Sequence, residues 1–161
     1  MGAIPDNVFI EEIQSVKQTA FGVAYLILKN TYDCEDAMSA AIVKAYEHRG
    51  KLRKRDSFRA WFLRILRNEA YTILRGRRKV IETDEIPEQS VCLPDTAAAM
   101  DMRAALMRLN EDQRNVLYLQ EEGYSMEEIA AVLAVPVGTV KSRLARAKDA
   151  LRMILEENSH E

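Results

Sequence analysis

The sequence predicts an all-α protein with two small helical domains joined by a flexible linker. Through most of the 161 residues, apolar side chains recur at the i, i+3, i+4 spacing of a buried helix face, and no strand pattern competes. Aromatic residues make up only 7%, with six glycines and four prolines, which suits helices better than a β-sandwich or barrel. Residues 80–95 hold Pro87, Pro94 and acidic side chains without a helical period. We therefore expect a linker at 80–95 between domains at 1–79 and 96–161.

The first two helices are expected at residues 8–28 and 33–46. Apolar residues follow helical spacing through the first helix, at Phe9, Ile13, Val16, Ala20, Val23 and Ile27. Asp33 is a suitable N-cap for the second helix, because a carboxylate can accept a hydrogen bond from a free backbone N–H there. Glu35 and Asp36 then fall in the first turn, where the helix dipole favours acidic side chains.

A basic loop and a long third helix follow. Residues 48–56 (HRGKLRKRD) indicate a loop, and Asp56 or Ser57 can cap a helix that runs to about Arg78. One side of this helix is apolar, and we expect core positions at Phe58, Trp61, Phe62, Ile65, Leu66, Ala70 and Ile73. The other side gathers Arg64, Arg67, Asn68, Tyr71 and Arg75, extended by Arg77, Arg78 and Lys79, and the loop adds Arg49, Lys51, Arg53, Lys54 and Arg55. Cations bind phosphates, Asn can bond a base edge and Tyr can stack on a base, so this face suits partly unpaired DNA.

The second domain is expected to begin with a helix at 95–108. Asn110 followed by Gln113 has the spacing of a capping box, which indicates the start of another helix. Gly123 is a natural residue to follow the end of that helix. Ser125 and Glu128 repeat the capping signal before a short helix at 126–133. After a turn at 134–135, Pro136 suits the first position of a last helix that continues to about Leu155. A short helix, a tight turn and a second helix form the helix-turn-helix plan of DNA-binding proteins.

The last helix has two distinct faces. The apolar face holds Val137, Val140, Leu144, Ala147, Leu151 and Ile154. The opposite side holds Lys141, Ser142, Ala145, Lys148 and Arg152, with Arg146 beside it. Gly138 and Thr139 are small residues near the N-terminus, which permits close approach to a DNA backbone. Such a helix can enter a major groove, although an ordinary amphipathic surface helix would show the same pattern.

The net charge of −2 conceals strongly charged blocks. Residues 49–79 carry 12 basic and 2 acidic side chains, and residues 141–152 carry 5 basic and 1 acidic. Residues 80–101 between them carry 6 acidic side chains and no basic one. Two basic blocks separated by an acidic stretch indicate two contacts with one polyanion, the alternative being two solvated helix faces.

Several function classes are disfavoured. Two cysteines, Cys34 and Cys92, cannot form a disulfide framework or a four-cysteine zinc site, and with only two histidines we expect neither a metal nor another cofactor. No Gly-rich phosphate loop or nucleophile elbow indicates an enzyme. The start shows no signal peptide, and the longest apolar stretch has nine residues, against the roughly 20 of a membrane span. A cytoplasmic protein with reduced thiols is expected, and a redox role of either cysteine stays open.

Short motifs in both halves of the chain match the pattern of one known family. One is the run YSMEEIAAVLAVPVGTVKSRLARA at 124–147, of which Pro136 to Arg143 is the most specific part. Upstream lie DCED at 33–36, KAY at 44–46 and FxxWxxRIxxN at 58–68. The upstream motifs resemble the first domain, and the run at 124–147 the second DNA-binding domain, of the extracytoplasmic-function (group IV) sigma factors of bacterial RNA polymerase, in the expected order. One helix-turn-helix is shared by many regulators, whereas both halves together are specific to this family.

The resemblance implies a transcription initiation factor that binds core RNA polymerase and promoter DNA. The first domain would recognise and melt the −10 element, and the position matching Asn68 contacts a flipped base whose pocket is lined by the loop matching 49–57. The second domain would read the −35 element as duplex, through the positions matching Lys141, Ser142 and Arg146. The helix that carries Asp33, Glu35 and Asp36 would meet the polymerase clamp, and an anti-sigma protein commonly holds such a factor inactive.

Two other functions stay open on the sequence. A helix-turn-helix regulator would bind duplex DNA without polymerase and use its N-terminal half to sense a ligand or dimerise. A polymerase-binding decoy would have lost promoter recognition. The sequence departs from the family at Ser39-Ala40, where Gln followed by an acid is usual, and at Leu52, where an aromatic is common.

Overall fold

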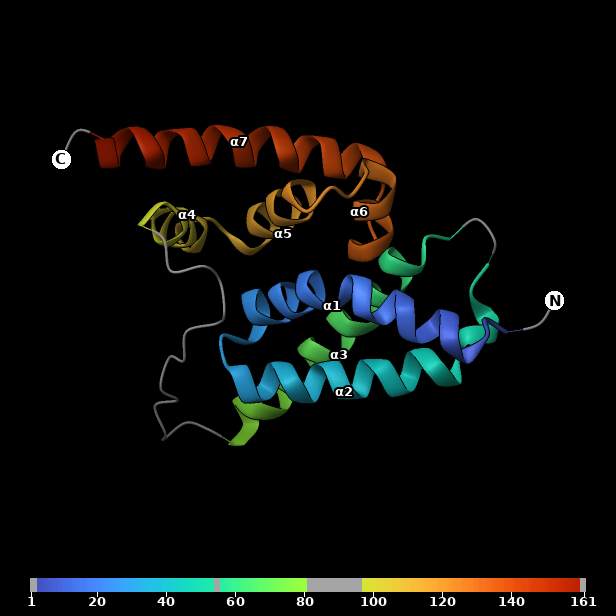
Figure 1. Ribbon diagram of the computed structural model, residues 1–161. Helices are drawn as coiled ribbons and strands as arrows, with labels where there is room; N and C mark the ends of the chain where they lie inside the picture. The colour runs from blue at the N-terminus through green and yellow to red at the C-terminus, as the bar shows by residue number, and fades with distance from the viewer. Residues whose placement is uncertain (1–2, 54–55, 81–96, 160–161) are drawn as a thin grey trace. The chain divides into compact units, whose positions relative to one another are not determined.

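The computed structural model describes residues 3–53, 56–80 and 97–159, and every regular element in these ranges is a helix (Figure 1). The chain divides into two compact units between Val91 and Cys92. That point falls within residues 81–96, which lie outside the described ranges, as does nearly all of the predicted linker at 80–95. The all-α fold class is confirmed, and the domain limits stay a prediction.

The N-terminal unit is a bundle of three helices. Helices α1 (Asp6–Leu28), α2 (Thr31–Glu47) and α3 (Phe58–Val80) all pack against one another, and a 3-10 turn, η1 (Arg49–Lys51), follows α2. The largest side chains of this unit with no exposed surface are Phe62, Leu28, Leu63 and Leu66, so α3 supplies most of the large core side chains and packs against both α1 and α2. Burying each side chain of this size contributes about 1.5–3 kcal/mol to folding.

Two expectations for this unit are corrected. Asn30, not Asp33, is the N-cap of α2, because Asn30 has an extended backbone and its side-chain oxygen accepts the Asp33 N–H at 3.0 Å. Asp33 therefore lies inside the first turn. Trp61, Ile65 and Ile73 are only half-buried. The Trp61 ring touches Phe58 at 5.8 Å between centroids, while Phe58 and Phe62 are buried as expected.

The structure distinguishes between Asp56 and Ser57, the two candidates for the N-cap of α3. The carbonyl of Ser57 accepts the N–H of Trp61 at 3.0 Å, the first bond of the helix, so Ser57 occupies the N-cap position. The carboxylate of Asp56 instead accepts the backbone N–H of Arg53 at 3.3 Å and closes the loop before the helix.

The C-terminal unit contains four helices, α4 (Ala97–Arg108), α5 (Glu111–Glu121), α6 (Met126–Leu133) and α7 (Val137–Ser159). Helices α4, α5 and α6 all pack against α7, whose apolar face supplies much of the core. Since α6 and α7 are joined by three residues, the expected helix-turn-helix is present (Figure 1). The last helix runs four residues beyond the expected end at Leu155.

Local signals define the ends of these helices. Both predicted capping boxes form in full, Asn110 with Gln113 and Ser125 with Glu128. Gly123 follows the end of α5 with φ +86°, a conformation that L side chains rarely adopt. Pro136 immediately precedes α7 rather than occupying its first position, and its carbonyl accepts the N–H of Val140 at 3.2 Å.

Candidate nucleic-acid interface

The outer face of α3 is a polar arc over a buried apolar face. Arg64, Asn68 and Arg75 are exposed, as expected from the spacing, whereas Phe62, Leu66 and Ala70 on the opposite face are buried. Hydrogen bonds run along the arc: Arg75 donates to the Thr72 hydroxyl at 3.3 Å, and that hydroxyl donates to the Asn68 carbonyl at 2.9 Å. The Asn68 side-chain amide makes no hydrogen bond to any described residue, so both its donor and its acceptor face solvent.

Arg67 and Tyr71 form a stacked pair on the same arc. The guanidinium carbon of Arg67 lies 4.9 Å from the centre of the Tyr71 ring, and both side chains are half-buried. The Tyr71 hydroxyl is buried and finds no hydrogen-bond partner among the described residues. A base stacking on Tyr71 would have to use the ring face that Arg67 leaves open, or displace the guanidinium.

The loop before α3 is only partly available to a ligand. Arg53 is exposed, and Lys54 and Arg55 lie outside the described residues. Arg49, which the sequence placed with the loop cations, lies 3.8 Å over the centre of the Tyr46 ring and donates to the Tyr46 carbonyl at 2.7 Å. Arg49 therefore ties the loop to the end of α2.

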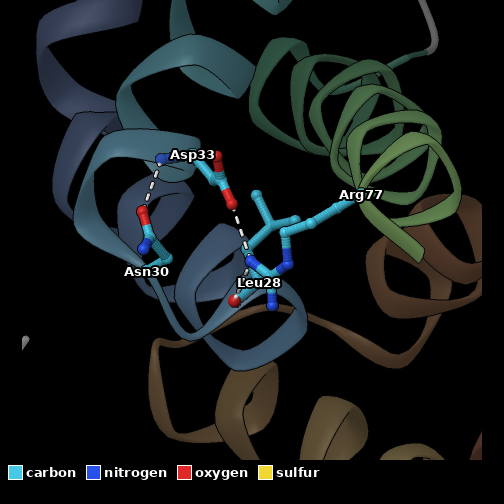
Figure 2. A network of polar contacts seen from close by, with 4 residues as sticks. All are labelled: Leu28, Asn30, Asp33 and Arg77. Atoms are coloured by element: carbon cyan, nitrogen blue, oxygen red, sulfur yellow. Dashed lines mark hydrogen bonds and ion pairs between the residues drawn. The ribbon is translucent and has the colours of Figure 1, made fainter. Parts of the chain in front are cut away.

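The acidic start of α2 divides into two parts. Glu35 and Asp36 are exposed, as a surface for a protein partner requires. Asp33 is half-buried and accepts a hydrogen bond from Arg77 of α3 at 2.6 Å (Figure 2). The expectation that Arg77 extends the basic arc is wrong, since its side chain turns toward the junction of α1 and α2. Arg78 and Lys79 have side chains outside the described part.

Helix α7 presents the predicted polar face in the C-terminal unit. Lys141, Ser142, Arg146, Lys148 and Arg152 are exposed, Thr139 is half-exposed, and the opposite face is buried at Val140, Leu144, Ala147 and Ile154. The Ser142 hydroxyl donates to the Gly138 carbonyl at 3.0 Å, so its oxygen still has lone pairs for an outside donor. Nothing lies within 4 Å of a Cβ built on Gly138, which leaves the start of α7 open to close approach.

The cations of α7 lie on two flanks of that face. Successive helical residues are about 100° apart, so Lys141, Lys148 and Arg152 share one flank. Arg146 lies about 160° around the helix from Lys148, on the other flank. A duplex groove has two phosphate walls and a floor of base edges, so the two flanks face different parts of it.

Sequence reasoning missed ion pairs between helices, two of which involve cations of the basic blocks. Arg143 lies 3.6 Å from Asp112 at the start of α5, which holds α7 to α5 rather than leaving the guanidinium for DNA. Glu69 is buried on α3 and pairs with Lys44 of α2. The third is Arg77 with Asp33. Each pair joins two different helices, so the spacing of residues along the sequence does not predict it.

No described helix has the length and apolar content needed to cross a membrane. Within the described residues, no three His, Cys, Asp or Glu side chains come together as metal ligands would.

Cys34 is fully buried, and desolvation raises the pKa of its thiol to about 12. Because the thiolate is the reactive form, Cys34 is unsuited to redox sensing, and Cys92 lies outside the described residues.

Comparisons with known proteins agree with this arrangement. Residues 13–80 match the family model for Sigma-70 region 2, and residues 99–151 match Sigma-70, region 4. The chain is 31% identical to the RNA polymerase sigma-H factor of Pseudomonas aeruginosa, with 94% of each chain covered. It is also 31% identical to the ECF RNA polymerase sigma-E factor of Escherichia coli, over 92% of this chain and 93% of that one.

Solved structures agree with the sequence matches. The sigma factor RpoE of Bartonella quintana, in complex with the anti-sigma factor NepR, has a TM-score of 0.75 and 27% identity, over 92% of this chain and 96% of that one. CnrH, in complex with the cytosolic domain of CnrY, shares the fold with a TM-score of 0.70, 22% identity and coverage of 95% and 90%. The helical units and the order of their family matches show that this chain belongs to the extracytoplasmic-function sigma factors, which direct core RNA polymerase to promoters where transcription begins.

Proposed function

We propose that the two polar faces divide the promoter between them, the α3 face binding the −10 element and the α7 face the −35 element. The observation that carries the proposal is that each compact unit exposes its own row of cations, opposite its own buried core. An acidic stretch separates the two rows in sequence, so the promoter DNA would contact the protein at two separate places rather than along one continuous surface.

The α3 face is suited to a melted strand because it combines three kinds of contact. Arg64 and Arg75 are exposed cations for phosphates, and Asn68 offers an amide that can bond one base edge in both directions. Arg67 and Tyr71 supply a cation and a ring on which a base can stack. Arg53, with its neighbours Lys54 and Arg55, would add phosphate contacts from the loop.

The α7 face is suited to a duplex. Thr139, Lys141 and Ser142 lie in its first turns, where a recognition helix reaches base edges, with Arg146 on one flank and Lys148 on the other. Asp149 is exposed two turns beyond Ser142 in nearly the same direction around the helix. Its negative charge would repel DNA there, which favours contact through the N-terminal half of α7.

The polymerase-binding surface would lie along α2. Tyr32, Asp36, Ser39 and Val43 follow helical spacing on one stripe, and Tyr32 and Val43 leave 66% and 57% of their surfaces exposed. Large apolar side chains in water beside the acidic Glu35 and Asp36 indicate a protein partner with basic and apolar groups. Since the solved RpoE of Bartonella quintana is bound to an anti-sigma factor, we infer that this chain has such a partner, works in the cytoplasm and contributes no catalysis of its own.

Run-off transcription with core polymerase on a promoter library tests the proposal. We expect specific initiation that is lost in Glu35→Lys combined with Asp36→Lys, while Glu11→Lys with Glu12→Lys on α1 retains it as a charge-matched control. A regulator would bind duplex DNA equally well without polymerase, and a decoy would bind polymerase without initiating. Either result would reject the proposed function.

A further inference from the structure

The end of α3 is held by one polar clasp. A single guanidinium nitrogen of Arg77, Nη1, donates to the Asp33 carboxylate at 2.6 Å and to the Leu28 carbonyl at 3.1 Å (Figure 2). Leu28 ends α1, and Asp33 lies in the first turn of α2, so one side chain of α3 binds both neighbouring helices where they meet. Both charged side chains are about three-quarters buried, at 25% and 23% exposure. Charge-assisted bonds in such a setting are stronger than those of exposed pairs.

The clasp satisfies groups that the helices leave open. The last carbonyls of a helix have no partner within it, and α1 has no basic residue of its own in its last turn. Arg77 supplies a hydrogen bond to one of these carbonyls and a positive charge at the negative end of α1. Asp33, whose backbone N–H is already bound by Asn30, uses its carboxylate for Arg77.

The last turns of α3 are less buried than the rest of the helix. Ala70 is the last side chain of α3 that is fully buried among those described, and the later ones up to Arg77 are half-buried or exposed. Gly76 immediately precedes Arg77, and glycine weakens a helix interior by about 1 kcal/mol relative to alanine. The segment 71–77 nevertheless carries Tyr71 and Arg75, two members of the polar arc. Their placement therefore depends on a stretch of helix that packs weakly.

We propose that Arg77 and Asp33 are positioning residues for promoter opening, and that Asp33 is not a polymerase contact. Their ion pair keeps residues 71–77 helical, so that Tyr71 and Arg75 stay in line with Asn68. The inference rests on the proposed role of the α3 face at the −10 element. It removes Asp33 from the acidic surface of α2 and leaves Glu35 and Asp36 there, because the Asp33 carboxylate is already bound within the molecule.

Hydrogen exchange and promoter opening together test the proposal in the full chain. In Arg77→Ala and in Asp33→Asn, amide protection over residues 71–79 should fall about tenfold, the equivalent of one charge-assisted hydrogen bond, while residues 60–66 keep theirs. Permanganate footprinting with core polymerase should show reduced opening, and polymerase affinity should be unchanged. Lys17→Ala is the matched control, since it removes an exposed cation of α1 outside the polar arc and should leave both the exchange pattern and promoter opening as they are.

A second substitution supplies a rescue that a lost DNA contact would not show. Nothing lies within 4 Å of a Cβ built on Gly76, so Gly76→Ala fits. It should raise the equilibrium constant for forming this part of the helix about three- to fivefold. Added to Arg77→Ala, it should restore much of both the protection and the opening. The proposal is overturned if Asp33→Asn weakens polymerase binding without changing exchange, or if residues 71–79 loosen while opening is unaffected. Failure of the unaltered chain to initiate would instead reject the proposed function, and the exchange data would still report on the clasp.

Discussion

Replacing Lys148 by alanine should weaken binding of the holoenzyme to every −35 sequence by the same factor. Lys148 is exposed on α7, seven residues beyond Lys141 and about 10 Å further along the helix axis. At that distance from the N-terminal turns, and on the flank of the helix, its ammonium can reach a phosphate but not the groove floor. A phosphate carries no sequence information, so the ranking of sites should stay the same.

The size of the effect follows from counterion release. Losing one phosphate contact should reduce the slope of log affinity against log salt by about 0.9. Between 50 and 200 mM salt, the ratio of the DNA affinity of the unaltered chain to that of Lys148→Ala should therefore fall about 3.5-fold. Lys148→Arg keeps the positive charge and should keep the slope, which makes it the matched control.

Arg146→Ala should behave differently because Arg146 lies one turn beyond Ser142 and about 40° around the helix from it, whereas Lys148 lies about 120° from Ser142. We expect its guanidinium to reach a base edge, so the loss should be about 1–3 kcal/mol at one position of the −35 element and small elsewhere. Binding of the holoenzyme to a −35 library, at several salt concentrations, measures both variants in one assay. Our orientation of α7 in the groove is wrong if Arg146→Ala scales every site equally while Lys148→Ala changes the ranking.

Three further predictions concern the other parts of the chain. Asn68→Ala should impair promoter opening more than duplex binding, because its exposed amide is placed for an unpaired base; a pre-melted template should rescue it in permanganate footprinting, and equal loss of both activities would refute the role. Limited proteolysis of the free chain should cut first within residues 80–95, and uniform protection there would count against a flexible linker. Cys34 should resist iodoacetamide at neutral pH in the folded chain and react after denaturation, since burial raises the pKa of its thiol to about 12; rapid labelling of Cys34 in the native protein, as distinct from Cys92 by peptide mapping, would contradict that burial.

Much of the fold could be predicted because its signals are local. The two capping boxes each join residues three apart, and both formed as the spacing predicted. Gly123 ends α5 in the left-handed conformation that its lack of a side chain permits. The faces of α3 and α7 follow from 3.6 residues per turn, so the exposed cations and most of the buried apolar residues could be assigned by counting. The family could be recognised for the same reason, because its motifs are short and continuous.

The partners of individual charged side chains were decided only by the tertiary structure. Arg77 looked like one more cation of a basic run, yet its partner is 44 residues earlier in the chain. Arg143 lies in the most specific part of the recognition motif and pairs with Asp112 on another helix. A long flexible side chain reaches several ångströms in any direction, so its partner depends on how two helices pack and not on its neighbours in sequence. The amino-acid sequence by itself thus determined the helices, their faces and the family, whereas helix packing decided which charges pair within the protein and which stay exposed.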